Sequence, residues 1–154
     1  MRQILIAFSF LLMGLTGCST TPNKQAFMPA TPSSPNMATV YIYRLSTPPY
    51  FLKPDIVINS KTVAELPTKT YTVVHLLAGT YEIKTKWDFS SGAILNRATT
   101  LTVAPKTVYY VEVFNEMDFI IYHSSIITKA LSEPPSAIQS CSLVSPLVVD
   151  IKPQ

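Results

Sequence analysis

Histidine side chains often bind metals or move protons near neutral pH, and the chain holds two of them, His75 and His123. Neither lies in an H-x-H, H-x-x-x-H or C-x-x-C arrangement, so their spacing supplies no metal with a set of ligands. Ser124 and Ser125 follow His123 directly, but sequence neighbours are not an activated nucleophile and base, and no G-x-S-x-G elbow occurs. We therefore expect no enzymatic activity. A hydrolase, the alternative, would need one of the histidines to meet a nucleophile in space.

Three carboxylates, Glu112, Glu116 and Asp118, cluster around a predicted strand end and the turn after it. Charged residues in such places usually face solvent, and a weak cation site is the alternative. Gly79 and Gly92 are the only glycines after residue 17, too few for a loop that cradles phosphates. The expectation is a protein without a cofactor.

Arg44 interrupts an otherwise apolar stretch that is rich in aromatic side chains. Its aromatic neighbours are Tyr41, Tyr43, Tyr50 and Phe51. An exposed patch of this composition is typical of protein interfaces, so these five residues are a candidate interaction patch. In the other interpretation, Arg44 caps a strand end and the tyrosines pack inside the domain.

Cys18 is the residue to which the sequence assigns a definite chemical role. One positive charge, Arg2, precedes twelve uncharged residues at 4–15, the length of a signal-peptide core and too short to span a bilayer. The residues at 15–18, LTGC, then resemble the lipobox of bacterial lipoproteins. This predicts that residues 1–17 are a lipoprotein signal peptide and that Cys18 carries the lipid after cleavage. Ordinary secretion, with Cys18 as a chance thiol, is the alternative.

The residues after Cys18 predict where the protein is held. Ser19 stands at the position where aspartate tends to retain lipoproteins in the inner membrane, so we expect the periplasmic leaflet of the outer membrane. Residues 18–37 contain four prolines and little to bury, which predicts a flexible linker. In polyproline II conformation this linker would place a domain up to about 60 Å from the lipid.

The composition predicts one all-β domain. Of 154 residues, 47% are hydrophobic and 14% charged, and 13 prolines stand against 4 glycines among many Val, Ile, Thr, Tyr and Phe residues. That is typical of short strands separated by turns. The net charge is only +3 and the lysines are scattered, which argues against a nucleic-acid partner.

Eight segments of the chain have the pattern of β-strands. Residues 80–87 alternate most clearly, with Tyr81 and Ile83 on one face and Lys84 on the other. Residues 39–45 are apolar on both faces, which suits a central strand covered on both sides or one with an interaction face. The expected strands are residues 39–45, 55–58, 62–66, 70–77, 80–87, 98–103, 108–114 and 119–127.

These strands predict a single seven- to eight-stranded β-sandwich, Ig-like or transthyretin-like, over residues 38–128. Two hairpins are expected, one around a turn at residues 59–61 and one that pairs 98–103 with 108–114. The pattern breaks after residue 129, so residues 129–154 form a C-terminal extension whose structure is left unassigned. Cys141 in this extension is either a buried thiol or one half of an intermolecular disulfide.

Several short motifs resemble a family of uncharacterised bacterial lipoproteins, a domain of unknown function related to PEGA and transthyretin-like sandwiches. They are VYIYR at 40–44, AEL at 64–66, KTY at 69–71, AGTYEI at 78–83 and VYYV at 108–111. Ser60, Lys69 and Ala78 depart from the usual glycine, glycine and proline of that family. The resemblance implies a β-sandwich in the cell envelope and supplies no catalytic residues.

Together these features predict a non-enzymatic, lipid-anchored module. Its expected role is structural or adaptor, with a membrane contact through the lipid and an envelope protein as partner. The alternative is a periplasmic lipoprotein that holds an apolar or glycan ligand against its tyrosines. A concave aromatic pocket would favour the ligand, and a flat exposed patch or an uncovered edge strand would favour the adaptor.

Overall fold

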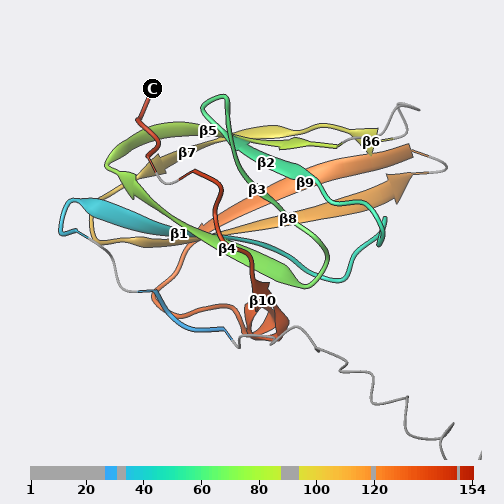
Figure 1. The fold of residues 1–154 in the computed structure, drawn as a ribbon, viewed down its shortest axis with the longest axis horizontal. Coiled ribbons are helices and arrows are strands. Elements are labelled where there is room, and N and C mark those ends of the chain that lie inside the picture. Colours follow the sequence, from blue (N-terminus) through green and yellow to red (C-terminus); the bar gives the residue numbers. More distant parts are fainter. Residues whose placement is uncertain (1–26, 31–33, 88–93, 119–120, 149) are drawn as a thin grey trace, which may run out of the picture.

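The structure of the protein is a computed structural model that describes residues 27–30, 34–87, 94–118, 121–148 and 150–154. The predicted signal peptide at 1–17 and the predicted lipidation site Cys18 lie outside these residues. One mixed and one antiparallel sheet pack face to face across a shared apolar core, as Figure 1 shows. The predicted all-β sandwich is therefore confirmed.

One sheet has the strand order β10-β4-β1-β8-β9-β6, and the other has the order β3-β2-β5-β7. Eight of these strands correspond to the eight expected segments, and β6 and β10 are two-residue additions. The strands are β1 (Met37–Arg44), β2 (Asp55–Ile58), β3 (Lys61–Glu65), β4 (Thr70–Leu77), β5 (Gly79–Lys86), β6 (Ile94–Leu95), β7 (Ala98–Val103), β8 (Val108–Asp118), β9 (Ile121–Ala130) and β10 (Ser142–Leu143).

Strand β5 follows the predicted alternation. Tyr81 and Ile83 are completely buried, whereas Lys84 and Lys86 are exposed. The inner faces of both sheets supply the core, which includes Val40, Ile42, Ile56, Ile58, Val74, Leu76, Leu101, Val111 and Val113. The periodicity of two in the sequence thus determined which side chains enter the sandwich.

The turn between β2 and β3 has the geometry of a tight hairpin. Asn59 and Ser60 both have positive φ angles, of 45° and 69°, and Lys69 before β4 has a φ of 56°. Glycine adopts such angles at no steric cost, whereas Ser60 and Lys69 hold them with a side chain present. Asn59 tolerates its angle and accepts a hydrogen bond from the Glu82 backbone N–H at 2.8 Å.

The predicted pairing of residues 98–103 with 108–114 is wrong. Strand β7 pairs with β5, whereas β8 pairs in parallel with β1 and antiparallel with β9. The turn at 104–107 therefore crosses from one sheet to the other. Backbone bonds from Lys106 N to Met37 O, at 2.9 Å, and from Thr39 N to Thr107 O, at 3.0 Å, join this crossing to the start of β1.

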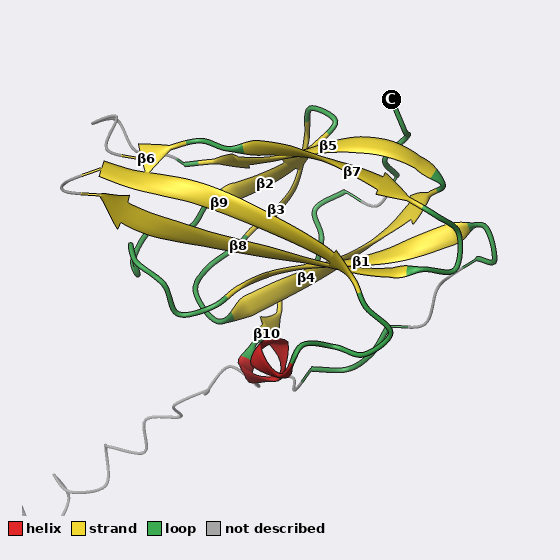
Figure 2. Cartoon of the chain, turned by 180° about the vertical axis from the view of Figure 1, so that it is seen from behind, coloured by secondary structure: helices red, strands yellow, loops and turns green. Residues whose placement is uncertain are grey.

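Strand β1 lies in the middle of its sheet and is buried on both faces over residues 38–44. Its outer face is covered by residues 27–30 and by the 3-10 helix η1 (Ser136–Ser140), which lies on the side of β4 and β10 that faces away from the other sheet (Figure 2). Residues 27–30, part of the predicted flexible linker, are thus packed onto the domain. None of the helices in the described ranges has the length and apolar character needed to cross a membrane.

The C-terminal residues also complete the inner core, so the compact domain extends well past residue 128. Ile151 is buried in the sandwich interior, and Leu147 N donates to Val63 O at 2.7 Å. Gln154 N donates to Thr80 O at 3.0 Å. A Cβ atom on Gly79, which has a φ of 152°, would lie 2.5 Å from Pro153 Cβ, so this close approach requires glycine.

Burial of the C-terminus can be tested with a matched pair of substitutions. Ile151→Ala removes a buried side chain and leaves a cavity, so we expect it to lower the free energy of unfolding by about 2–4 kcal/mol. Leu147→Ala removes a side chain that is 66% exposed, and its effect should stay within about 0.5 kcal/mol. Urea unfolding followed by circular dichroism measures both. Equal, small effects would contradict the contribution of residues 150–154 to the core.

Candidate protein-interaction site

The structure divides the predicted interaction patch into a buried part and an exposed part. Tyr41, Tyr43 and Arg44 lie inside the protein, with Arg44 at 0% exposure. Tyr50 is 55% exposed and Phe51 is 100% exposed. The prediction of one continuous surface patch is therefore wrong, because the chain's own ends cover Tyr41 and Tyr43 on the outer face of β1 and the Arg44 guanidinium is turned into the protein. The loop at residues 45–54 keeps the exposed aromatic pair.

The buried tyrosines belong to one aromatic cluster on that outer face. Tyr41 comes from β1, Tyr71 from β4 and Tyr110 from β8, and the Tyr41 and Tyr110 rings stack with centroids 5.0 Å apart. The Tyr43 hydroxyl donates to Glu112 Oε2 at 3.0 Å. Burial, and then the negative charge of Glu112, raise the pKa of Tyr43, so it stays a neutral donor.

Arg44 ends β1 with its guanidinium turned into the protein. Nη1 donates to the carbonyl oxygens of Leu52, at 2.7 Å, and Leu66, at 3.4 Å. Nη2 donates to those of Thr47, at 3.0 Å, and Pro49, at 2.7 Å. Three of these four carbonyls belong to the loop at 45–54, so one side chain fixes that loop at several points. This agrees with the interpretation of Arg44 as a cap at a strand end.

The charge of Arg44 is balanced by dipoles rather than by a carboxylate. Within the described part of the chain it makes no ion pair, and its Cζ lies 5.0 Å from the Trp87 ring centroid. Burial lowers the pKa of Arg44 to about 10, which leaves it charged at neutral pH. A buried charge is costly unless its hydrogen bonds are made, so loss of the carbonyl contacts would destabilise the protein, and loss of the guanidinium would leave the carbonyls unpaired.

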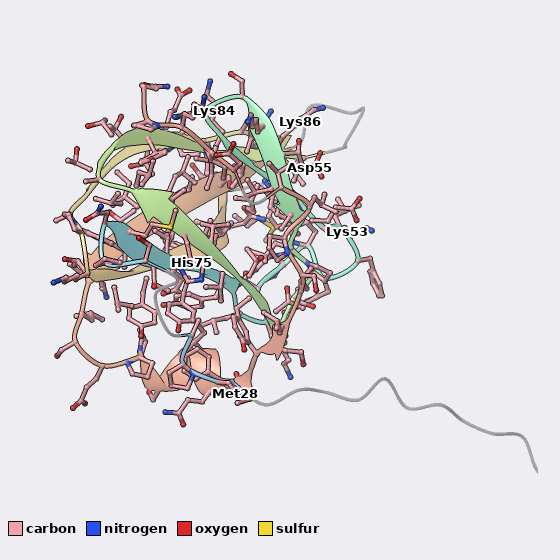
Figure 3. All side chains as sticks on the ribbon, turned by 60° about the vertical axis from the view of Figure 1, so that its left-hand side comes forward. Met28, Lys53, Asp55, His75, Lys84 and Lys86 are labelled. Atoms are coloured by element: carbon pink, nitrogen blue, oxygen red, sulfur yellow. The ribbon has the colours of Figure 1, made fainter. Side chains whose placement is uncertain are left out.

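The loop that Arg44 fixes carries the exposed aromatic residues on the surface. The Asn115 side chain adds a further bond, from Nδ2 to Pro48 O at 3.2 Å. Beside the loop lies a shallow depression of about 280 Å³ with charges of both signs, and Figure 3 shows Lys53, Asp55 and Lys86 along this side of the molecule. The residues that line it are Phe51, Leu52, Lys53, Asp55, Glu65 and Lys86.

Two opposite charges in this depression are already paired, since Lys53 Nζ contacts Glu65 Oε2. An apolar ring next to a charged rim is the usual anatomy of a small protein-binding site, in which the ring enters a pocket of the partner. The six residues that line the depression include no serine, cysteine or histidine that could act as a nucleophile with its base.

The other polar candidates lie apart from this loop. Ser124 is buried, and its hydroxyl bonds to Thr85 Oγ1 at 2.9 Å and accepts from Trp87 Nε1 at 3.3 Å, so it links the two sheets. His75 Nδ1 lies 3.4 Å from Thr39 Oγ1 on β1. His123, in contrast, is on β9, and Ser125 lies two residues further along it.

The structure does not assemble Glu112, Glu116 and Asp118 into a cation site. Glu112 accepts the hydrogen bond from Tyr43, and Glu116 and Asp118 are exposed along β8. Over the described residues, no group of three or more His, Cys, Asp or Glu side chains is close enough together to hold a metal ion.

Cys141 is a buried thiol. It belongs to the aromatic cluster, its Sγ lies 3.8 Å from Arg44 O, and burial raises the pKa of the thiol. A thiol that is both buried and protonated is a poor nucleophile and is shielded from another molecule. Of the two alternatives left open by the sequence, the structure favours the buried thiol over an intermolecular disulfide.

The role of Phe27 was missed by the sequence analysis. Its ring lies 5.5 Å from the Tyr41 centroid and 5.3 Å from the Tyr71 centroid. The sequence offered one indication of this packing, because Phe27 is a large aromatic residue in an otherwise polar and proline-rich segment.

Comparison with known protein families finds one match. Residues 34–125, more than half of the chain, match a family described as a protein of unknown function, DUF2846. The matched region includes β1 to β8, the start of β9 and the loop at 45–54. Neither the curated proteins nor the solved structures contain a match to the chain.

The contribution of Arg44 can be tested by Arg44→Lys. Lysine keeps the positive charge but cannot present the planar fork that reaches four carbonyls, so we expect the free energy of unfolding to fall by about 2 kcal/mol. Lys106→Ala, at an exposed turn, is the control and should change it by less than about 0.5 kcal/mol. Chemical denaturation measures both. An Arg44→Lys variant as stable as the parent protein would mean that the carbonyl contacts add little.

Proposed function

The chain belongs to the DUF2846 family, and we propose that it is a non-enzymatic lipoprotein of the bacterial cell envelope that binds a protein partner through the loop carrying Tyr50 and Phe51. In this proposal Cys18 carries the lipid and anchors the protein to the periplasmic leaflet of the outer membrane. The β-sandwich, proposed to be of the PEGA and transthyretin-like kind, acts as a structural or adaptor module.

The single observation that carries this proposal is the complete exposure of Phe51 on a loop that is held in place from inside. Transfer of an apolar ring from water to an apolar environment is favourable, and burial of the exposed Phe51 ring in a partner would contribute about 1.5–3 kcal/mol. Because Arg44 already fixes the loop carbonyls, little conformational entropy is lost on binding. An exposed aromatic anchor on a preorganised loop is therefore well suited to recognition.

The lipid anchor is supported by the sequence features at residues 15–19, and the packing of residues 27–30 changes its expected reach. With Phe27 fixed on the domain, only residues 19–26 separate it from Cys18. In polyproline II conformation those residues span about 25 Å, less than half of the full linker. The proposed partner would then be met close to the membrane surface.

The ligand-binding alternative has less support. It requires a ligand to reach the tyrosines, and Tyr41, Tyr43, Tyr71 and Tyr110 are all buried beneath residues of the same chain, so a small ligand would first have to displace those residues. The exposed Phe51 needs no rearrangement to meet a protein surface.

The lipid anchor is tested by Cys18→Ala in cells that express the full precursor. We expect the wild-type protein to sediment with the outer membrane and the variant to be lost from that fraction, because the acyl chains have no site of attachment. Ser19→Asp is the matched variant for sorting and should move the protein to the inner membrane. A Cys18→Ala variant that still fractionates as the wild type would contradict the lipid anchor.

The interaction loop is tested by replacing Phe51 with the photocrosslinker p-benzoylphenylalanine in the lipidated protein. We expect a discrete crosslinked adduct, and Phe51→Ala should weaken binding of the captured partner about ten-fold or more, as for an interface hot spot. Leu77, 43% exposed at the far end of β4, is the control position and should give no such adduct. The same adducts from both positions, or none from position 51, would contradict the proposal.

A further inference from the structure

The outer face of the β10-β4-β1-β8-β9-β6 sheet is occupied by an extended piece of the chain, residues 27–30, which we call the strap. The Phe27 ring lies between Tyr41 and Tyr71, at centroid distances of 5.5 and 5.3 Å. Ala30 also packs against the aromatic cluster. The strap has no regular secondary structure and adds no strand to the sheet.

Tyrosine hydroxyls hold the strap by its backbone. The Met28 N–H donates to the Tyr71 hydroxyl oxygen at 3.4 Å, and the Ala30 N–H donates to the Tyr41 hydroxyl oxygen. Pro29 lies between these two donors and has no N–H of its own, so proline leaves no donor unpaired there. Met28 and Pro29 are exposed. Figure 3 shows Met28 at the edge of the molecule.

This arrangement has the chemistry of an aromatic-lined peptide site. Rings from neighbouring strands supply apolar contact, their hydroxyls bind alternate backbone groups, and the bound segment contains a proline that limits its conformations before binding. A four-residue segment fits this site if it begins with an aromatic residue, has any residue second, proline third and a small residue fourth. The strap supplies all of them as FMPA at residues 27–30.

We propose that the tyrosine face formed by Tyr41, Tyr71 and Tyr110 is a binding site for an extended segment of a partner protein with this aromatic-x-Pro-small pattern. The strap occupies the site as a built-in competitor. A partner segment that displaces the strap frees residues 27–30 from the sheet. The site is separate from the Phe51 loop and does not depend on the lipid anchor.

The strap differs from the parts of the chain that complete the core. Ile138 and Cys141 cover the same cluster and are buried, whereas two of the four strap residues are exposed. Removal of the strap therefore uncovers the tyrosines without opening the inner core between the sheets. Because the strap is partly exposed and lies outside the inner core, a segment of another protein can replace it on the tyrosines.

The test uses a fluorescent synthetic peptide with the sequence of residues 25–36, QAFMPATPSSPN, and the full mature chain in detergent. Binding is followed by fluorescence anisotropy to the parent protein and to Phe27→Ala, in which the strap has lost its ring. The affinity should be about ten-fold or more higher for the variant, because a weakened internal competitor leaves a larger fraction of the sites free. The same peptide with alanine in place of phenylalanine is the matched control ligand and should not bind.

Two further measurements separate a binding site from ordinary packing. Tyr71→Phe in the Phe27→Ala background keeps the ring and removes one hydroxyl acceptor, so peptide affinity should fall about five-fold. The melting temperature of Phe27→Ala should stay within about 4 °C of the parent. The absence of peptide binding to Phe27→Ala would overturn the proposal. A fall of more than about 10 °C in its melting temperature would also do so, because the strap would then be part of the core.

Discussion

The fold around the candidate site depends on a buried guanidinium. Arg44 enters the interior at the end of β1, completely removed from solvent, and four backbone carbonyls with the Trp87 ring surround it. A buried charge is costly unless it is hydrogen-bonded, so the loop at 45–54 brings its carbonyls to Nη1 and Nη2, whereas the buried Nε has no partner among the described residues. That requirement leaves the side chains of Tyr50 and Phe51 on the outside. Tyr50 and Phe51 are therefore exposed because the loop turns its backbone carbonyls inward to stabilise the buried guanidinium.

A second constraint is the apolar outer face of β1. A strand with tyrosines on one side and aliphatic residues on the other must be covered on both sides, and the second sheet can cover only one. The ends of the chain supply the rest: residues 27–30 from the N-terminal side, and Ile138 and Cys141 from the C-terminal side. Segments that carry little secondary structure therefore cover this face of the domain. Their packing also places part of the proposed linker against the sheet.

Much of the fold could be predicted because it is a local property of the sequence. The alternation that ends in Trp87 and the β-branched runs defined the eight longer strands closely. Strand pairing was harder to predict, because the sequence patterns of β7 and β8 do not show which sheet each strand joins. The turn between them also resembles a hairpin turn. The C-terminal residues lack any period of two, so the burial of Ile151 was not foreseeable. The candidate patch was wrong as one surface, since three of its five residues are buried, and the convergence of carbonyls on Arg44 is a tertiary feature.

If Arg44 holds the loop at 45–54 rigid, backbone ¹⁵N relaxation of the non-proline residues of 46–53 tests this role most directly. We expect order parameters near the rigid value of about 0.85 in the parent protein, and values below about 0.6 in Arg44→Lys, with the rest of β1 unchanged. A loop that is already mobile in the parent protein, or one equally rigid in the variant, would contradict the role of Arg44.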